Sequence, residues 1–226
     1  MVFAKAGIPW VLGASLIAMG SYFLFPKDLR GIGLAFFLLT IPLIILTLFI
    51  VYFFRDPNRL PEVQYKPGIS VLSPADGSIC AIEQEGNDTA IYVEMHVTNV
   101  HVTRAHMGGT VKKVSRLSGH HYPIYFLKKR VGAESEAIRK NARVVIEFED
   151  DLGNPFIYHL VCGKLARRAR PYVKPGQKIT EGERVGVICF GSLVKITMPG
   201  TKYKMIAKIG QNVLGGRTII CERILE

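Results

Sequence analysis

The sequence predicts a mainly β protein, in which a barrel-sandwich-like domain follows an N-terminal transmembrane helical hairpin. Three observations lead to this fold class. Long charge-free runs are confined to the first 54 residues. From residue 55 onward, short segments rich in β-branched and aromatic residues alternate with Gly, Asn, Asp and Pro, which is typical of strands and turns. Two glycine turns within residues 173–186 resemble the paired turns of barrel-sandwich hybrid domains.

The N-terminal part holds two apolar runs. Residues 8–25 carry no charge, and residues 32–54 form a charge-free run of 23 residues, long enough to cross a bilayer as a helix. We therefore expect helices at about 8–25 and 32–54, which make residues 1–54 a membrane anchor. A signal peptide with Lys5 as its basic region is the alternative for the first run, but bulky residues at 22–26 stand where a small-residue cleavage site is needed.

Basic residues around the hairpin predict its orientation. The link between the two runs carries Lys27 and Arg30, whereas more basic residues flank the outer ends. Because cytoplasmic loops are enriched in Lys and Arg, both ends are expected inside the cell. This places the protein in the cell membrane, with residues 55–226 in the cytoplasm. Four cysteines are expected to remain thiols there, and none forms a Cys-x-x-Cys pair: Cys80, Cys162, Cys189 and Cys221.

The charge predicts an anionic partner. The formal net charge is +11, and residues 55–226 alone hold 26 Lys and Arg against 17 Asp and Glu, a net +9. Charge by itself fits both nucleic acid and anionic lipid headgroups. The adjacent apolar runs favour an anionic membrane surface, so we expect no nucleic-acid partner.

The remainder of the chain predicts one domain of short strands. Prolines in residues 55–68 predict an extended connector, so the domain boundary falls there. Residues 150–155 are typical of a hairpin turn. Residues 132–141 fit either a short helix or a loop. The expected strands are 78–82, 90–95, 97–102, 143–148 and 156–161.

Three segments carry residues that chemistry could use. Gly191 and Ser192 form a Gly-Ser bond in a late apolar segment, while Asp76 and His101 lie in upstream runs. Together Ser192, His101 and Asp76 supply the side chains of a Ser-His-Asp constellation. A serine hydroxyl is a weak nucleophile and needs a base within hydrogen-bond reach. Gly191, which lacks a side chain, suits the attacked carbonyl position next to it.

Other histidines compete for the base role or suggest a metal. His96 and His106 each lie five positions from His101, an odd step that would turn them to the other face of a regular strand. The adjacent pair His120 and His121 would likewise point to opposite faces, so no metal site is expected.

The three segments, with residues 53–59 and 166–168, resemble the short form of the phosphatidylserine decarboxylase proenzymes. The Asn-Val-His-Val run at 99–102, followed by Arg104, matches the family motif and selects His101 as the base. The resemblance implies that Ser192 attacks the Gly191 carbonyl and that the chain is cut between 191 and 192. It also implies that Ser192 becomes a covalent pyruvoyl cofactor, and that the large and small chains stay together.

The same resemblance implies the substrate and the reaction. Phosphatidylserine would lose carbon dioxide to give phosphatidylethanolamine, the pyruvoyl ketone taking the part that pyridoxal phosphate plays elsewhere. His101 would act again as proton donor and Asp76 would hold the imidazole in the useful tautomer. Two departures from the family pattern are residues 137–141, where an Asn-Glu-Arg-Asn type segment is expected, and His106, where proline is common.

A rival interpretation needs no chemistry. A non-enzymatic, membrane-anchored barrel-sandwich adaptor would use the hairpin and the paired glycine turns, would not need Ser192, and would remain one intact chain. A lipoyl carrier lacks a Lys at an obvious turn, and a peptidase acting on other proteins does not explain a nucleophile directly after Gly191. The sequence leaves the oligomeric state open, a homo-oligomer included.

Overall fold

A computed structural model describes residues 2–4, 7–24, 30–124, 135–164, 168–189 and 192–225. The chain divides into two compact units, Met1–Asn58 and Arg59–Glu226. Each unit is built from its own secondary structure and is described by itself.

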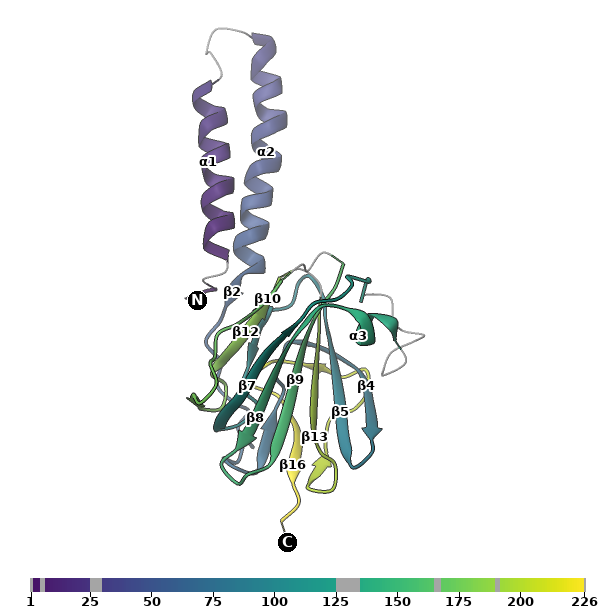
Figure 1. The fold of residues 1–226 in the computed structure, drawn as a ribbon. Helices are drawn as coiled ribbons and strands as arrows, with labels where there is room; N and C mark the ends of the chain where they lie inside the picture. Colours follow the sequence, from purple (N-terminus) through teal and green to yellow (C-terminus); the bar gives the residue numbers. More distant parts are fainter. Residues whose placement is uncertain are drawn as a thin grey trace. The chain divides into compact units, whose positions relative to one another are not determined.

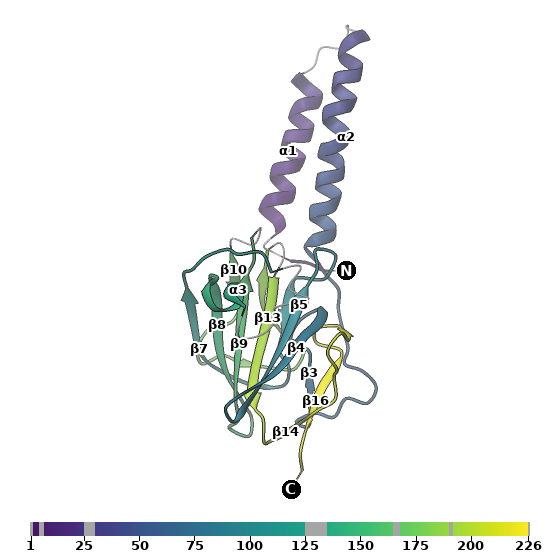
Figure 2. The same cartoon turned by 90° about the vertical axis from the view of Figure 1, so that its right-hand side faces the viewer.

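The first unit is a helical hairpin. Helices α1 (Ile8–Leu24) and α2 (Arg30–Phe53) lie side by side in both views (Figures 1 and 2). The short strand β1 (Val2–Phe3) pairs antiparallel with β2 (Arg55–Asp56) at the base of the hairpin. The two predicted helices are therefore confirmed as helices. Within the part of the chain that the structure describes, neither of them combines the length and apolarity that a bilayer crossing requires.

The second unit is mainly β, as predicted. An eight-stranded sheet has the order β11-β7-β8-β9-β13-β5-β4-β15, and two three-stranded sheets have the orders β10-β12-β6 and β14-β16-β3. Among the described residues, the strands of these three sheets all pair antiparallel. The large sheet consists of β4 (Gly77–Glu85), β5 (Asp88–Met95), β7 (Gly109–Leu117), β8 (Arg143–Asp150), β9 (Pro155–Cys162), β11 (Lys178–Ile179), β13 (Ser192–Pro199) and β15 (Asn212–Val213). The smaller sheets consist of β3 (Ser70–Leu72), β6 (Val102–Arg104), β10 (Ala169–Pro171), β12 (Arg184–Ile188), β14 (Tyr203–Met205) and β16 (Ile219–Arg223).

The large sheet curls into a half-barrel, which gives it an inner and an outer face (Figures 1 and 2). The inner face, which includes Val144, Leu160 and Val194, packs into the main core with residues of the two smaller sheets. The outer face carries a smaller cluster that includes residues of the short helix α3 (Glu136–Lys140). Side chains of a strand alternate between the two faces, so the parity of a residue decides which cluster it joins.

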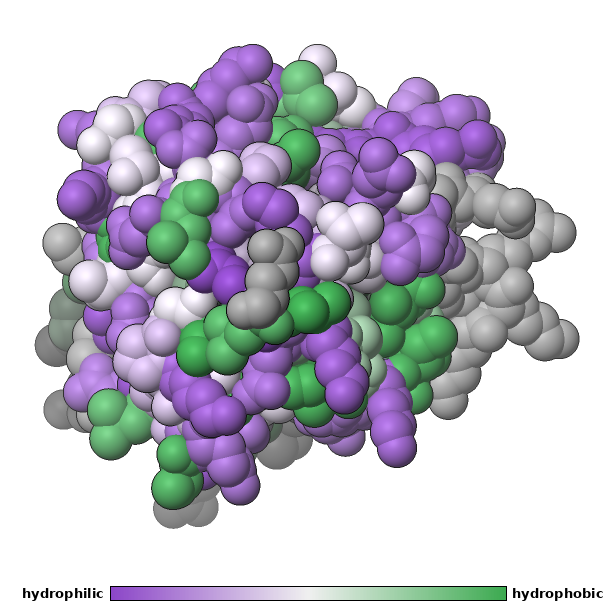
Figure 3. All heavy atoms as spheres, turned by 90° about the horizontal axis from the view of Figure 1, so that it is seen from below, coloured by the Kyte–Doolittle hydropathy of each residue, from purple (hydrophilic) through white to green (hydrophobic). Residues whose placement is uncertain are grey.

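The lower end of the second unit is largely hydrophilic. Seen from below, charged and polar atoms cover most of this face and hydrophobic groups interrupt them in separate patches (Figure 3). This distribution is ordinary for a folded β domain, whose surface always retains some apolar atoms.

Most of the predicted elements are confirmed. The predicted strands 78–82, 90–95, 143–148 and 156–161 lie within β4, β5, β8 and β9. The predicted hairpin turn at 150–155 joins β8 to β9, with Gly153 at φ 81°. Of residues 132–141, those at 136–140 form α3, and 132–134 lie outside the described residues.

The predicted strand at 97–102 is wrong. His96 and Asn99 close a turn there: the His96 N–H donates to Asn99 Oδ1 at 2.7 Å, and the Asn99 N–H donates to the His96 carbonyl at 2.9 Å. Asn competes for backbone hydrogen bonds in this way, so it overrides the β-branched residues around it. The strand that follows, β6, begins only at Val102.

Candidate active site

Three separate elements supply the predicted site residues. Ser192 is the first residue of β13, Asp76 directly precedes β4, and His101 directly precedes β6. All three are buried, at 1%, 3% and 1% exposure respectively. Gly191, the predicted attacked residue, lies outside the described residues.

Ser192 faces the main core. It pairs with Met95 on β5 and with Cys162 on β9, and both of these partners belong to the inner-face cluster. The Ser192 hydroxyl donates to the Met95 thioether sulfur at 3.2 Å. Because a thioether is a weak acceptor, this contact holds the hydroxyl only loosely.

The His101 ring is held in one tautomer. Its Nδ1 lies 2.9 Å from the Asn99 carbonyl oxygen, which can only accept, so Nδ1 carries the proton and Nε2 carries the lone pair. The orienting role predicted for Asp76 is therefore carried here by the Asn99 backbone carbonyl. The His101 carbonyl in turn accepts the Ile188 N–H at 3.2 Å.

A backbone hydrogen bond ties the loop that carries His101 to the segment that leads to Ser192. Ile188 is four residues before Ser192, so the two are at most about 14 Å apart even on an extended chain. The structure therefore brings the loop of His101 close to the start of β13, although 90 residues separate His101 from Gly191 in the chain.

Asp76 is held by contacts from three directions. Its carboxylate forms a buried ion pair with Arg59, in which one guanidinium nitrogen lies 2.6 Å from Oδ2 and the other contacts Oδ1. It also accepts the Gly215 N–H at 2.8 Å and the Val100 N–H at 3.4 Å. Since Val100 directly precedes His101, Asp76 positions the His101 loop through its backbone.

The rival histidines have other surroundings. His96 is exposed on the turn after β5. His106 is fully buried against aromatic rings, with 4.0 Å between its ring centroid and that of Phe156. Its Nδ1 contacts the Tyr158 hydroxyl, and burial lowers the pKa of His106 to about 3. The geometry makes His106 a neutral core residue.

Sequence reasoning missed the partners of the site residues. Arg59 was noted only as part of the 53–59 segment, although a buried aspartate needs a cationic or N–H partner. The Asn99 carbonyl and the Met95 sulfur carried no signal in the sequence, because their roles depend on backbone position and on strand pairing.

Comparisons with known proteins identify the family of this chain. A profile of the family described as "Phosphatidylserine decarboxylase" matches residues 46–221. A phosphatidylserine decarboxylase proenzyme of Solibacter usitatus is 34% identical over 83% of this chain and 85% of its own. One from Ralstonia pickettii is 34% identical over 98% of this chain and 95% of its own. A Methanococcoides burtonii protein, provisionally named an archaetidylserine decarboxylase proenzyme, is 29% identical over 98% of this chain and 97% of its own.

A buried serine begins a core strand, and a histidine with a fixed tautomer is bonded through its backbone to the segment before that strand. These features define a candidate enzyme centre rather than an adaptor surface. The chain belongs to the phosphatidylserine decarboxylase family. It is therefore a decarboxylase enzyme, and the adaptor interpretation is wrong.

Proposed function

We propose that this chain is a proenzyme that cuts itself between Gly191 and Ser192 and then decarboxylates phosphatidylserine through a pyruvoyl group formed from Ser192. The observation that carries the proposal is the position of Ser192: it begins β13, and Ile188, four residues earlier, is bonded to His101. The names of the relatives support the reaction and the proenzyme character.

Self-cleavage needs only groups of the chain itself. His101 Nε2 accepts the proton of the Ser192 hydroxyl, and Oγ attacks the Gly191 carbonyl carbon. The Gly191–Ser192 C–N bond breaks as the C–O bond forms, so an ester replaces the amide and the Ser192 nitrogen takes the proton. Removal of the Ser192 α-proton then breaks the Cβ–O bond, which releases the Gly191 carboxylate and leaves dehydroalanine. Water hydrolyses this residue and ammonia departs.

The surroundings of Ser192 fit a small, uncharged ketone at the new N-terminus. Its neighbours across the sheet are Met95 and Cys162, and burial raises the pKa of the Cys162 thiol to about 11, so both walls stay neutral. A pyruvoyl group at this place supplies an electron-accepting carbonyl for the loss of carbon dioxide. With its proton held on Nδ1, His101 would use the Nε2 lone pair for proton transfer near the substrate carbon.

The lipid substrate is defined by its serine headgroup. The relatives are named for phosphatidylserine or archaetidylserine, two lipids with the same phosphoserine headgroup and different tails. We assign phosphatidylserine as the substrate because the family profile bears that name. Turnover assays with both lipids test the assignment.

We further propose that residues 1–54 attach the enzyme to the cell membrane, with the second unit in the cytoplasm. Large apolar side chains along both helices support the attachment: Leu16 is 62% exposed, Ile45 61% and Leu48 63%. Soluble monomers rarely expose so much contiguous apolar surface. The net +9 of residues 55–226 supports an additional attraction to anionic lipid.

Intact-mass measurement of the purified, folded full chain tests self-cleavage. We expect a fragment that ends at Gly191 and a second that begins with a blocked residue 192. Ser192→Ala removes the nucleophile and should give one full-length mass, whereas Ser78→Ala, on β4, should cut normally. A single full-length mass for the natural chain, in folded protein, would overturn the proposal.

A further inference from the structure

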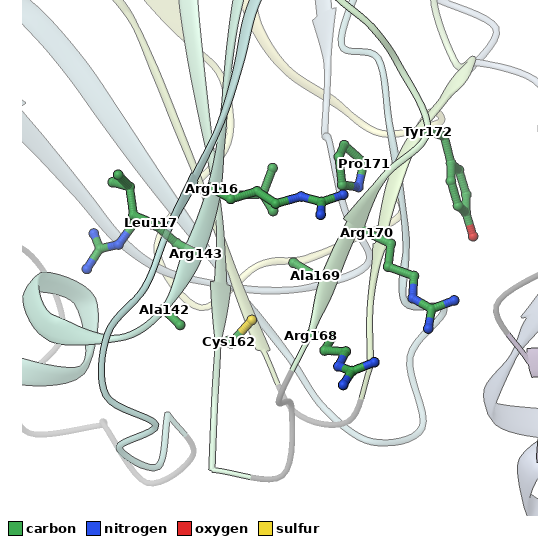
Figure 4. A pocket seen from close by; sticks show the side chains of 11 residues that line it. Arg116, Leu117, Ala142, Arg143, Cys162, Arg168, Ala169, Arg170, Pro171 and Tyr172 are labelled. Atoms are coloured by element: carbon green, nitrogen blue, oxygen red, sulfur yellow. The ribbon is translucent and has the colours of Figure 1, made fainter.

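A cavity of about 580 Å³ lies beside the strands that surround Ser192. It is lined by the end of β7, the start of β8, the end of β9, and β10 with its flanking residues (Figure 4). Cys162 forms part of this lining and is also the cross-strand partner of Ser192. The cavity therefore adjoins the candidate active site.

Strand register decides which arginine side chains lie on the same face of the sheet as Ser192. Arg116 pairs with Val144, whose side chain belongs to the inner-face core, so Arg116 emerges on the same face as Ser192. Arg143 also borders the cavity, but it pairs with Leu117, emerges on the opposite face and donates its Nε–H to the Asn141 carbonyl at 3.0 Å. Figure 4 shows the same division: the Arg116 side chain extends toward β10, whereas that of Arg143 extends the other way with Leu117.

Two more arginines come from the segment around β10. Arg170 pairs with Val187 on β12, and the Arg168 carbonyl accepts the Cys189 N–H at 3.4 Å. Burial raises the pKa of the Cys189 thiol, and the positive charge of Arg170 opposes that rise. The arginine-bearing strand therefore runs beside the residues that lead to Gly191.

The positive charge of the cavity is unbalanced. No Asp or Glu lines it, and among the described residues no carboxylate forms an ion pair with Arg116, Arg168 or Arg170. All three side chains are exposed to solvent. Guanidinium groups bind phosphate oxygens through two parallel N–H bonds, which lysine does not reproduce. Such a cavity selects an anion with several oxygens.

We propose that this cavity binds the phosphodiester of the lipid headgroup through Arg116, Arg168 and Arg170; the assignment rests on the proposed decarboxylation. A short ester arm separates the phosphorus from the amino nitrogen and carboxylate of the serine headgroup. A phosphate held in the cavity therefore brings the reacting end of the headgroup toward residue 192.

The headgroup offers two anions, and the reaction excludes the carboxylate as the partner of these arginines. The carboxylate loses its charge when carbon dioxide leaves, so a guanidinium bound to it would stabilise the substrate more than the transition state and slow the reaction. The phosphodiester keeps its charge throughout. Binding of the phosphodiester lowers the free energies of the bound substrate and of the transition state equally. This is what is expected of arginines that only position the lipid.

Binding of the product tests the proposal, because phosphatidylethanolamine retains the phosphate and lacks the carboxylate. The full, cleaved enzyme is titrated in detergent with short-chain phosphatidylethanolamine, and KM is measured for short-chain phosphatidylserine. Each of Arg116→Gln, Arg168→Gln and Arg170→Gln should raise both the Kd and the KM about tenfold, the effect of about 1.4 kcal/mol. Lys204→Gln, on β14 and outside the cavity, removes the same charge and should change neither.

The outcomes separate the alternatives. A raised KM with an unchanged Kd for phosphatidylethanolamine would show that the arginines bind the carboxylate. An unchanged KM and Kd in all three variants would show that the cavity does not bind the lipid. Either result overturns the proposal. Arg170→Lys keeps the positive charge but cannot form the two parallel N–H bonds. It should therefore bind more tightly than Arg170→Gln and less tightly than the natural chain. Intact masses are recorded for every variant, so that a failure of self-cleavage is distinguished from a failure of binding. Inorganic phosphate serves as a competitor. If the cavity recognises phosphate, inorganic phosphate should displace the lipid weakly. Binding that phosphate does not disturb would indicate recognition of the lipid tails and would contradict the assignment.

Discussion

Arg59 and Asp76 form a buried ion pair in which two guanidinium nitrogens each face one carboxylate oxygen. The same carboxylate accepts the N–H groups of Val100 and Gly215, so a single side chain joins three distant segments of the second unit. One of these segments carries His101. The ion pair is thus part of the support that holds the candidate base in place.

Arg59→Gln should destabilise the second unit and slow self-cleavage. It leaves the Asp76 charge buried without its cation, which typically costs about 3–5 kcal/mol. Urea unfolding measures the loss, and the cut fraction is read from a denaturing gel. Arg139→Gln, an exposed position on α3, is the control and should change neither. The double variant Arg59→Gln with Asp76→Asn should lose less free energy of unfolding than the sum of the two single variants, because no unpaired charge remains buried. Strictly additive losses would contradict a direct ion pair.

His101→Ala should leave the chain uncut over the period in which the natural chain is processed. Loss of a general base typically slows a reaction about 100-fold or more. Intact mass against time measures the rate, and circular dichroism checks that the variant is folded. His96→Ala, whose ring lies on an exposed turn, is the matched control and should be cut normally. Normal cutting of a folded His101→Ala variant would move the base role to another group.

The second unit should lose stability as the pH falls below about 6.5, and His106 should contribute to the loss. Burial lowers the pKa of His106 to about 3, so between these pH values the unfolded chain binds a proton that the folded chain does not. The contribution is about 1.4 kcal/mol per pH unit in that window. Urea unfolding at pH 6 and pH 4 measures the slope. His106→Phe should have a slope smaller by about one proton, and an unchanged slope would exclude His106 as the source.

Two truncations should behave differently although they differ by five residues. A chain that begins at residue 55 keeps Arg59 and should still cut itself, because the described site contacts lie within Arg59–Glu226. A chain that begins at residue 60 lacks the cation and should resemble Arg59→Gln in both stability and cutting. Intact mass and urea unfolding compare the two. Equal cutting rates would separate the ion pair from self-cleavage.

The chain that begins at residue 55 should bind anionic vesicles in a salt-dependent way. Its net +9 attracts anionic headgroups, and exposed charges are screened over about 10 Å at 0.1 M salt. Co-sedimentation with phosphatidylglycerol vesicles across a salt series measures the affinity, with phosphatidylcholine vesicles as the neutral control. Binding that ignores salt or lipid charge would contradict the electrostatic part of the membrane proposal.

Local patterns account for the elements that were predicted correctly. Alternation of buried and half-buried residues in β8 follows directly from its sequence, as does the turn at Gly153. The strand predicted at 97–102 failed because Asn99 bonds back to His96, a contact between a side chain and the backbone that outweighs β propensity over so short a segment.

The sequence by itself determined the class of fold, the candidate nucleophile, base and orienting aspartate, and the family resemblance. Strand periodicity, turn residues and motif order can all be read directly from the chain. Only the tertiary structure decided the partners of these residues. Strand pairing placed Ser192 opposite Met95 and Cys162. The folding of the connecting segments brought Arg59 to Asp76 and the Asn99 carbonyl to the His101 ring. The same pairing set Arg116 and Arg143 on opposite faces, since a shift of one residue in register exchanges the faces of a strand and composition alone cannot specify that register.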